Sequence, residues 1–114
     1  MSKELKNGRH EDEAGTIRWY QCDILHREEG PAVEYLDGSK EWWLSGKLNR
    51  VEWSNGAKFW YKDDEFHRED GPAIVYSNNE KEWYLNDVKL TEAEFNERTA
   101  ILLEVTPTQK RVKI

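Results

Sequence analysis

Apolar and polar residues alternate in short runs along most of the chain, and turn residues separate the runs. In AVEYLDGSKEWWL (32–44) two such runs flank Asp37-Gly38. This dipeptide is typical of a two-residue type I′ turn, whose two central residues both need a positive φ. The same turn chemistry recurs at Asn55-Gly56 and Asn78-Asn79. The pattern therefore predicts a series of β-hairpins.

The hairpins are copies of one repeat. Their turns share a column that holds Gly15, Gly38, Gly56 and Asn79, so successive copies begin 23, 18 and 23 residues apart. Four positions later each copy has a tryptophan, in the order Trp19, Trp42, Trp60 and Trp83. The step of 18 residues is shorter because copy three lacks five residues: LNRVEW (48–53) aligns with LHREEGPAVEY (25–35) once EEGPA is removed. Repeats of this kind stack on one another and share a continuous core.

Folding each copy about its turn predicts the register of the strands. Val33 then lies opposite Trp42, and the later copies set Val51 opposite Trp60 and Ile74 opposite Trp83. A branched side chain opposite an aromatic one is a favourable cross-strand pair. By the period of two, the inward face is expected to hold Val33, Tyr35, Trp42, Leu44, Val51, Trp53, Trp60, Ile74, Tyr76, Trp83 and Leu85.

The opposite face mixes charged and aromatic residues. It is expected to carry Glu34, Glu41, Glu52 and Glu82, and also Tyr20, Trp43, Phe59, Tyr61 and Tyr84. One interpretation is that loops or the coiling of the sheet cover these aromatic side chains. The other is a half-exposed aromatic stripe that contacts a partner.

The C-terminal part of the chain leaves the hairpin pattern. Thr91-Glu92-Ala93-Glu94 is a capping box and predicts a helix over 92–104. Its apolar side would hold Phe95, Ile101, Leu102 and Val105, and it would cap the end of the sheet and cover the last strand's edge. We therefore expect an all-β single domain over 1–114, an antiparallel repeat sheet of about four consecutive hairpins with a C-terminal capping helix. Its parts are a degenerate N-terminal segment (1–14), hairpin repeats (15–90), the capping helix (91–105) and a basic tail (106–114).

A charged heptad occurs twice, as HREEGPA (26–32) and HREDGPA (67–73). A catalytic set usually occurs once, so two copies in equivalent places favour a scaffold role. We expect the glycines to supply a positive φ at a bend and the imidazoles to pack on an aromatic ring of the next copy. Arg27 and Arg68 either pair with nearby carboxylates such as Glu28 and Asp70, or hold an anionic group of a ligand.

Composition and motifs exclude several classes of function. A net charge of -6 disfavours binding to a nucleic-acid backbone, and no apolar stretch approaches the length of a membrane span. Cys22 is the only cysteine, which excludes an internal disulfide. His26 and His67 could join a metal site only in a tightly curled sheet. We predict no catalytic residue, metal or cofactor, and the polar N-terminus leads us to expect a cytoplasmic protein.

The repeat resembles a known type. The pattern DGSKEWWLSGKL with HREDGPA, over residues 15–98, resembles MORN-type repeats and, more closely, the HREDGPA-containing MORN-like repeat proteins of bacteriophages. The chain departs from the MORN pattern, because GPA stands where Gly-x-Gly is usual. The resemblance implies a repeat sheet that makes protein contacts, dimerises or binds lipid. For a small phage protein it also implies the binding and blocking of a host factor.

These observations predict a non-enzymatic protein-binding module. Its partner would be a bacterial host factor, such as a defence protein, that a phage-encoded inhibitor or adaptor occludes in the host cytoplasm. The candidate binding residues are Tyr20, Trp43, Phe59, Tyr61, Tyr84, Arg27, Arg68, His26 and His67. Two alternatives stay open: a module that sequesters an anionic nucleotide, and a structural homo-oligomer, such as a homodimer, that pairs through an uncovered edge strand.

Overall fold

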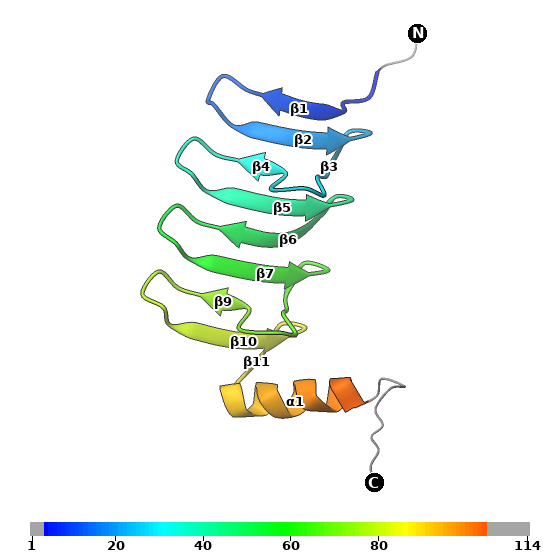
Figure 1. Ribbon diagram of the computed structural model, residues 1–114. Helices are drawn as coiled ribbons and strands as arrows, with labels where there is room; N and C mark the ends of the chain where they lie inside the picture. Colours follow the sequence, from blue (N-terminus) through cyan, green and yellow to red (C-terminus); the bar gives the residue numbers. More distant parts are fainter. Residues whose placement is uncertain (1–3, 105–114) are drawn as a thin grey trace.

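Eleven short strands form one antiparallel sheet, and a single helix follows it (Figure 1). The computed structural model describes residues 4–104. The strands are β1 (Gly8–Glu11), β2 (Ile17–Gln21), β3 (Ile24–Leu25), β4 (Val33–Glu34), β5 (Lys40–Leu44), β6 (Lys47–Glu52), β7 (Lys58–Lys62), β8 (Glu65–Phe66), β9 (Ile74–Val75), β10 (Lys81–Leu85) and β11 (Val88–Leu90), and the helix is α1 (Glu92–Glu104). The predicted fold class is confirmed. The segment expected to be degenerate also forms a hairpin, because β1 pairs with β2.

The order of the strands explains the five residues that copy three lacks. The sheet runs β1-β2-β4-β5-β6-β7-β9-β10-β11, with β3 beside β2 and β8 beside β7. Leu25 of β3 and Val33 of β4 both pair with β2, so β3 and β4 are the two halves of one interrupted strand. In copy three the single strand β6 takes the place of both halves. The heptad is therefore a loop that leaves the sheet and returns to it.

The predicted two-residue turns are wrong, because each hairpin closes with three residues. In copy two Tyr35 N–H donates to Ser39 O at 2.9 Å and Gly38 N–H donates to Tyr35 O at 3.0 Å. Gly38 has a φ of 94°, whereas Asp37 has no positive φ. The Asp37 carboxylate accepts from Ser39 N–H at 2.8 Å, which favours a type I turn followed by one left-handed residue. Residues 12–16, 53–57 and 76–80 repeat this geometry.

Type I′ turns do occur, at the other end of the strands, where one copy joins the next. Both central residues have a positive φ in four dipeptides: Cys22-Asp23, Ser45-Gly46, Asp63-Asp64 and Asn86-Asp87. They follow the same steps of 23, 18 and 23 residues as the repeat. These turns were not predicted, because none of the four is an Asn-Gly or Asp-Gly pair.

One extra residue in each turn moves the register by one position. Val33 pairs with Glu41, Val51 with Phe59 and Ile74 with Glu82, so the three predicted valine or isoleucine pairs with tryptophan are wrong. A shift of one residue sends a strand's side chains to the opposite face. One face, which we call the tyrosine face, therefore holds Val33, Val51 and Ile74 together with Tyr20, Trp43, Phe59, Tyr61 and Tyr84. The other holds Trp19, Trp42, Trp60 and Trp83, and we call it the arginine face because Arg50 lies there opposite Trp42.

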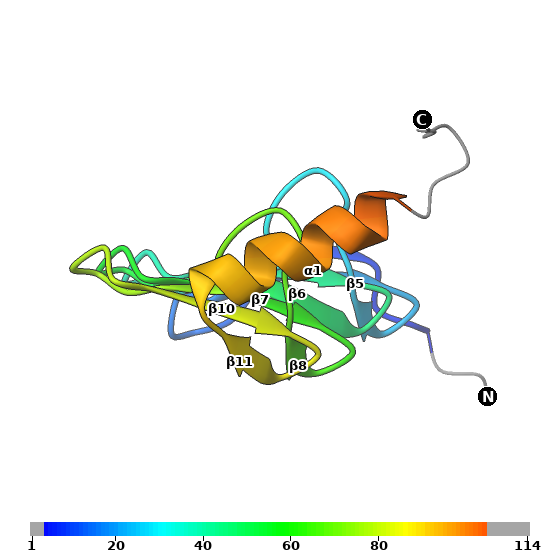
Figure 2. The same ribbon diagram turned by 90° about the horizontal axis from the view of Figure 1, so that it is seen from below.

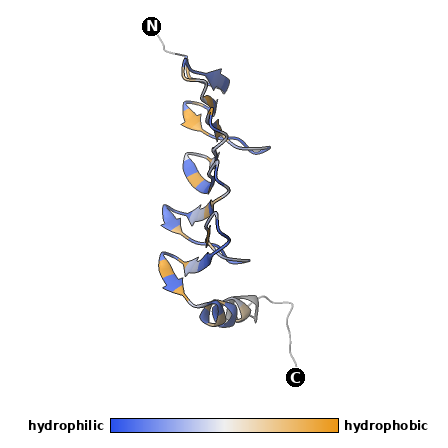
Figure 3. Cartoon of the chain, turned by 90° about the vertical axis from the view of Figure 1, so that its left-hand side faces the viewer, coloured by the Kyte–Doolittle hydropathy of each residue, from blue (hydrophilic) through white to orange (hydrophobic). Residues whose placement is uncertain are grey.

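The sheet is one layer and has very little interior. Its buried apolar residues in the described part are Ala32, Val33, Val51, Ala57, Ala73, Ile74, Leu90 and Phe95. The largest fully buried side chain is that of Val33. Seen along the strands, the apolar stretches are spread over successive copies of a thin stack (Figure 3). The predicted inward face is thus not a closed core, and Trp53 keeps 45% of its surface exposed.

The helix ends the stack, as predicted. Thr91 and Glu94 form the reciprocal capping box, with distances of 2.9 Å from Thr91 N to the carboxylate and 3.1 Å from Glu94 N to the hydroxyl. Phe95 is 4% exposed, and α1 packs on β10 and β11. The side chains of Ile101 and Leu102, together with Val105 and the basic tail, lie outside the described residues. The helix and the heptad loops lie on the same side of the sheet (Figure 2).

Exchanges at Gly56 test the three-residue turns. Gly56 has a φ of 95° with open space around a Cβ, whereas Asn79 holds the equivalent place with a φ of 72°. We expect Gly56→Ala to lower the free energy of unfolding by about 1 kcal/mol, and Gly56→Asn by clearly less, because Asn tolerates the left-handed region. Urea denaturation measures both. Equal losses for the two variants would contradict this turn geometry.

Candidate functional site

Each heptad loop leaves the sheet opposite a tryptophan. His26 N–H donates to Trp19 O at 3.0 Å, and Trp19 N–H donates to Ala32 O at 2.7 Å. His67, Trp60 and Ala73 make the equivalent pair of bonds at 3.1 and 2.7 Å. The first and last residues of the heptad therefore stay in register with one tryptophan, and the five residues between them stand off the arginine face.

The heptad arginine folds back over that tryptophan. The Arg27 guanidinium carbon lies 4.0 Å from the centre of the Trp19 ring, and Arg68 lies 4.0 Å from that of Trp60. Each guanidinium also donates to the carbonyl of the heptad proline at 3.2 Å. A cation over an indole ring contributes about 0.5–2 kcal/mol, depending on how far it is desolvated.

Carboxylates complete the surroundings of both arginines. Arg68 Nε lies 2.8 Å from Asp70, and an Arg27 amino group lies 3.6 Å from Glu34. The expected pair of Arg68 with Asp70 is found, whereas Arg27 pairs with Glu34 and Glu28 pairs with His26. Since ring, carbonyl and carboxylate already occupy the guanidinium groups, they are poorly placed to hold an anionic ligand.

The heptad glycines leave space for the guanidinium group of the heptad arginine. Neither Gly30 nor Gly71 has a positive φ, so the expected role at a left-handed bend is wrong. A Cβ on Gly30 would lie 3.3 Å from the Arg27 guanidinium carbon, and one on Gly71 would lie 3.0 Å from that of Arg68. A side chain at either position would press on the stacked guanidinium.

Copy three makes the same contact without the heptad. Arg50 extends from β6 and lies between two rings, at 4.7 Å from Trp42 and 5.2 Å from Trp60. It also pairs with Glu52. We call the set Trp19, Arg27, Trp42, Arg50, Trp60 and Arg68 the arginine ladder. Arg50 was missed, although its place in the alignment of LNR with LHR pointed to it.

The heptad histidines hold the type I′ turn at the end of their own copy. His26 Nδ1 accepts from Ser45 N–H at 2.8 Å, and His67 Nδ1 accepts from Asn86 N–H at 2.9 Å. Their Nε2 atoms lie 3.3 Å from Glu28 and 2.9 Å from Glu69. An accepting Nδ1 places the proton of a neutral imidazole on Nε2. The expected packing of the imidazoles on aromatic rings is replaced by these bonds.

The two histidines serve two separate junctions. Within residues 4–104 no three side chains of His, Cys, Asp or Glu are grouped as metal ligands. In copy one the Asn7 side-chain oxygen accepts from Cys22 N–H at 2.9 Å, the same bond that the histidines make in copies two and four. An amide can thus do the work of the imidazole, which supports a scaffold role.

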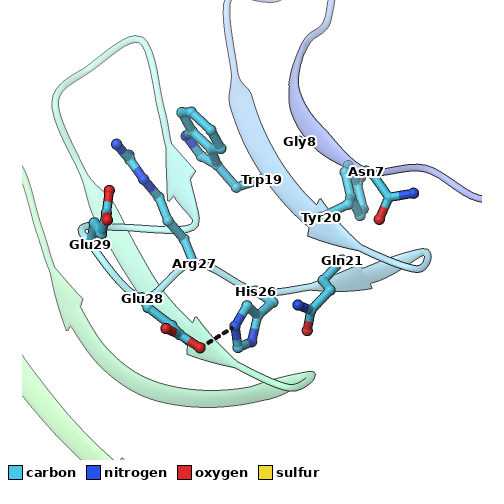
Figure 4. Close-up of a pocket in the computed structure, with 9 residues that line it drawn as sticks. All are labelled: Asn7, Gly8, Trp19, Tyr20, Gln21, His26, Arg27, Glu28 and Glu29. Atoms are coloured by element: carbon cyan, nitrogen blue, oxygen red, sulfur yellow. Dashed lines mark hydrogen bonds and ion pairs between the residues drawn. The ribbon is translucent and has the colours of Figure 1, made fainter.

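A hollow of about 450 Å³ lies beside the first heptad loop (Figure 4). Arg27 lies alongside Trp19 on one side of it, and Glu28 reaches His26 on another. Glu28 and Glu29 both line the hollow, so an anionic ligand would meet two carboxylates there. This charge disfavours the nucleotide-sequestering alternative at this place.

The tyrosine face brings all five predicted aromatic residues onto one surface. Tyr61 stacks on Phe66 with ring centres 4.9 Å apart, and Phe66 lies 5.3 Å from Tyr84 and 5.9 Å from Phe59. Trp53 joins the cluster at 6.0 Å from Phe59. Phe66 and Trp53 were missed as site residues, because the predicted register did not show which rings share a face.

Two carboxylates fix other aromatic side chains on this face. Glu41 accepts from the Tyr35 hydroxyl at 2.9 Å and from the Trp43 indole N–H at 2.8 Å. Glu82 accepts from the Tyr84 hydroxyl at 3.0 Å. Burial raises the pKa of Tyr84, as does this hydrogen bond, so the hydroxyl stays a donor at neutral pH. The polar ends of Tyr35, Trp43 and Tyr84 are therefore fixed by carboxylates on this face.

Comparison with known proteins assigns no family. No family model, no curated protein and no solved structure matches the chain. Within residues 4–104 no helix is long and apolar enough to cross a membrane. Evidence for a function therefore comes from the geometry of the two faces.

A double-mutant cycle at Arg68 and Gly71 tests the arginine ladder. Arg68→Ala should lower the free energy of unfolding by about 1–2 kcal/mol, since it removes the ring contact and the bond to the Pro72 carbonyl. Gly71→Ala should cost about 1 kcal/mol, because its methyl group displaces the guanidinium.

In the Arg68→Ala background the second change should cost almost nothing, because the methyl group then has no guanidinium to displace. Urea denaturation of the four proteins measures the coupling. If the two losses of unfolding free energy are additive, Gly71 is not required to leave space for the Arg68 guanidinium.

Proposed function

We propose that the chain is a non-enzymatic protein-binding module and that the tyrosine face is its contact surface. The observation that carries this proposal is an aromatic surface continuous from Trp53 to Tyr84 on the side away from α1 and the heptad loops. Tyrosine and tryptophan dominate the residues that contribute most to protein–protein binding. Rings already held by neighbours and carboxylates lose little conformational freedom on binding.

The shape of the surface supports a macromolecular partner. Exposed aromatic residues follow the stack from copy to copy, with 37% of Tyr35, 45% of Trp53 and 36% of Tyr76 accessible. Contiguous exposed apolar residues often mark an interface. We assign binding to Tyr20, Trp43, Phe59, Tyr61 and Tyr84 and add Phe66 and Trp53. Arg27, Arg68, His26 and His67 are assigned to the scaffold that aligns the copies.

The resemblance to HREDGPA-containing phage proteins suggests the kind of partner. We propose a phage-encoded inhibitor or adaptor that occludes a bacterial host protein, such as a defence protein, in the host cytoplasm. A net charge of -6 would steer association with a basic surface on that partner. The mechanism is steric: the sheet lies over a functional surface of the partner and performs no chemistry on it.

Variants of the two faces test this assignment. Trp53→Ala combined with Tyr61→Ala should weaken capture of a bacterial partner by tenfold or more, since residues of this kind each contribute about 2 kcal/mol in central positions. The control is Leu44→Ala combined with Val88→Ala, which removes exposed apolar side chains (44% and 56% exposed) from outside the tyrosine face.

Affinity capture from bacterial lysate with quantitative mass spectrometry, followed by titration of the captured protein, gives the readout. Circular dichroism confirms that each variant is folded. If the control pair loses the partner and the tyrosine-face pair keeps it, the proposed surface is wrong.

A further inference from the structure

The first strand of the sheet, β1, has an outer edge on which the outward-directed backbone groups can be identified. Asp12 N–H donates to Thr16 O, and Gly8 and His10 pair with Tyr20 and Arg18 of β2. Because hydrogen-bonding direction alternates along a strand, Gly8 and His10 direct their backbone groups toward β2. Arg9 and Glu11 therefore direct their N–H and C=O groups outward. Within residues 4–104 no strand pairs with that outer side.

The opposite end of the stack does not offer such an edge. The chain passes from β11 directly into α1, which packs on β10 and β11 and lies beyond them at the end of the sheet (Figure 1). A second copy therefore cannot extend the sheet head to tail, from the last strand of one molecule to the first strand of the next. The remaining way to extend the sheet joins two first strands about a twofold axis.

The side chains of β1 are complementary to themselves in that arrangement. Arg9 and Glu11 lie two residues apart on the arginine face, with side chains 50% and 51% exposed, and they pair with each other at 3.3 Å. In one antiparallel register Arg9 lies opposite Glu11 of the second copy and Glu11 lies opposite Arg9, with His10 on the axis. Neighbouring registers that use the same backbone groups set Arg9 opposite Arg9 or Glu11 opposite Glu11, and like charges oppose pairing.

We propose that β1 is a homodimer interface, in which it pairs antiparallel with β1 of a second copy in the register that matches Arg9 with Glu11. Charged side chains usually protect an edge strand from other chains. Here the charged side chains select one register of the paired strands. Opposite charges two residues apart attract a second β1 in that register and repel it in the neighbouring registers. The interface is short, so the dimer is weak and depends on concentration.

This interface goes beyond the proposed function and does not depend on it. A twofold axis perpendicular to the sheet keeps the tyrosine faces of both copies on the same side. The dimer would therefore present one sheet of twice the length, and a partner with two equivalent surfaces would bind it with increased avidity.

Charge reversal tests the interface by complementation. Arg9→Glu and Glu11→Arg each place like charges opposite one another at both ends of the paired strands, and each should raise the dimer dissociation constant by about tenfold or more. An equimolar mixture of the two variants should dimerise like the unmodified chain, because each variant then meets opposite charges. The double variant Arg9→Glu with Glu11→Arg should do the same.

Sedimentation equilibrium up to about 1 mM protein gives the dissociation constants. Lys62→Glu and Glu29→Arg change the net charge by the same amounts at other exposed positions and should leave the dimer unchanged. Restored association in the mixture supports the register. A monomeric unmodified chain, unaffected single variants or a monomeric mixture would each overturn the proposal. None of these outcomes bears on capture of a partner by the tyrosine face.

Discussion

A sheet of one layer has no interior in which to place its large side chains, and the rest of this structure follows from that constraint. The largest fully buried side chain is that of Val33, although the chain has six tryptophans. A ring can therefore be covered only by side chains on the surface of the stack, and Trp53 keeps 45% of its surface exposed. For Trp19, Trp42 and Trp60 on the arginine face, the cover is a guanidinium that comes eight residues after the tryptophan. Arg27 and Arg68 extend from a loop, and Arg50 extends from a strand.

The heptad can be understood from this one requirement. The histidine accepts a bond from the next turn, the arginine covers the ring, and the proline carbonyl accepts from the arginine. The glycine leaves room for the guanidinium, and the alanine, 0% exposed at Ala32, returns the chain to the sheet beneath the loop. Residues that resemble catalytic groups in the sequence are thus occupied in joining one copy to the next.

Local signals in the sequence predicted a large part of this fold. The turn column, the five-residue gap and the capping box at Thr91 depend only on nearby residues, and the structure confirms the hairpins and the helix. The register was wrong because each hairpin turn has three residues instead of two, and in copy two the Asp37 carboxylate, which accepts from Ser39 N–H, favours this longer turn. Five aromatic site residues share a face as expected, but Phe66 at the centre of their cluster and the ring contacts of Arg50 depend on pairing between copies.

The two faces differ in this arrangement: the arginine face aligns the copies, and the tyrosine face is the surface that we propose for contact with a partner. The arginine ladder is tested most directly by the proton chemical shifts of Arg27 and Arg68 in solution. A guanidinium 4.0 Å from the centre of an indole ring brings its Nε–H and δ-methylene protons into the shielding region of that ring. We expect these protons to be shifted upfield relative to those of Arg98, an exposed residue of α1 for which no cation–π contact is found within residues 4–104. Shifts equal to those of Arg98 would contradict the stacking of arginine on tryptophan.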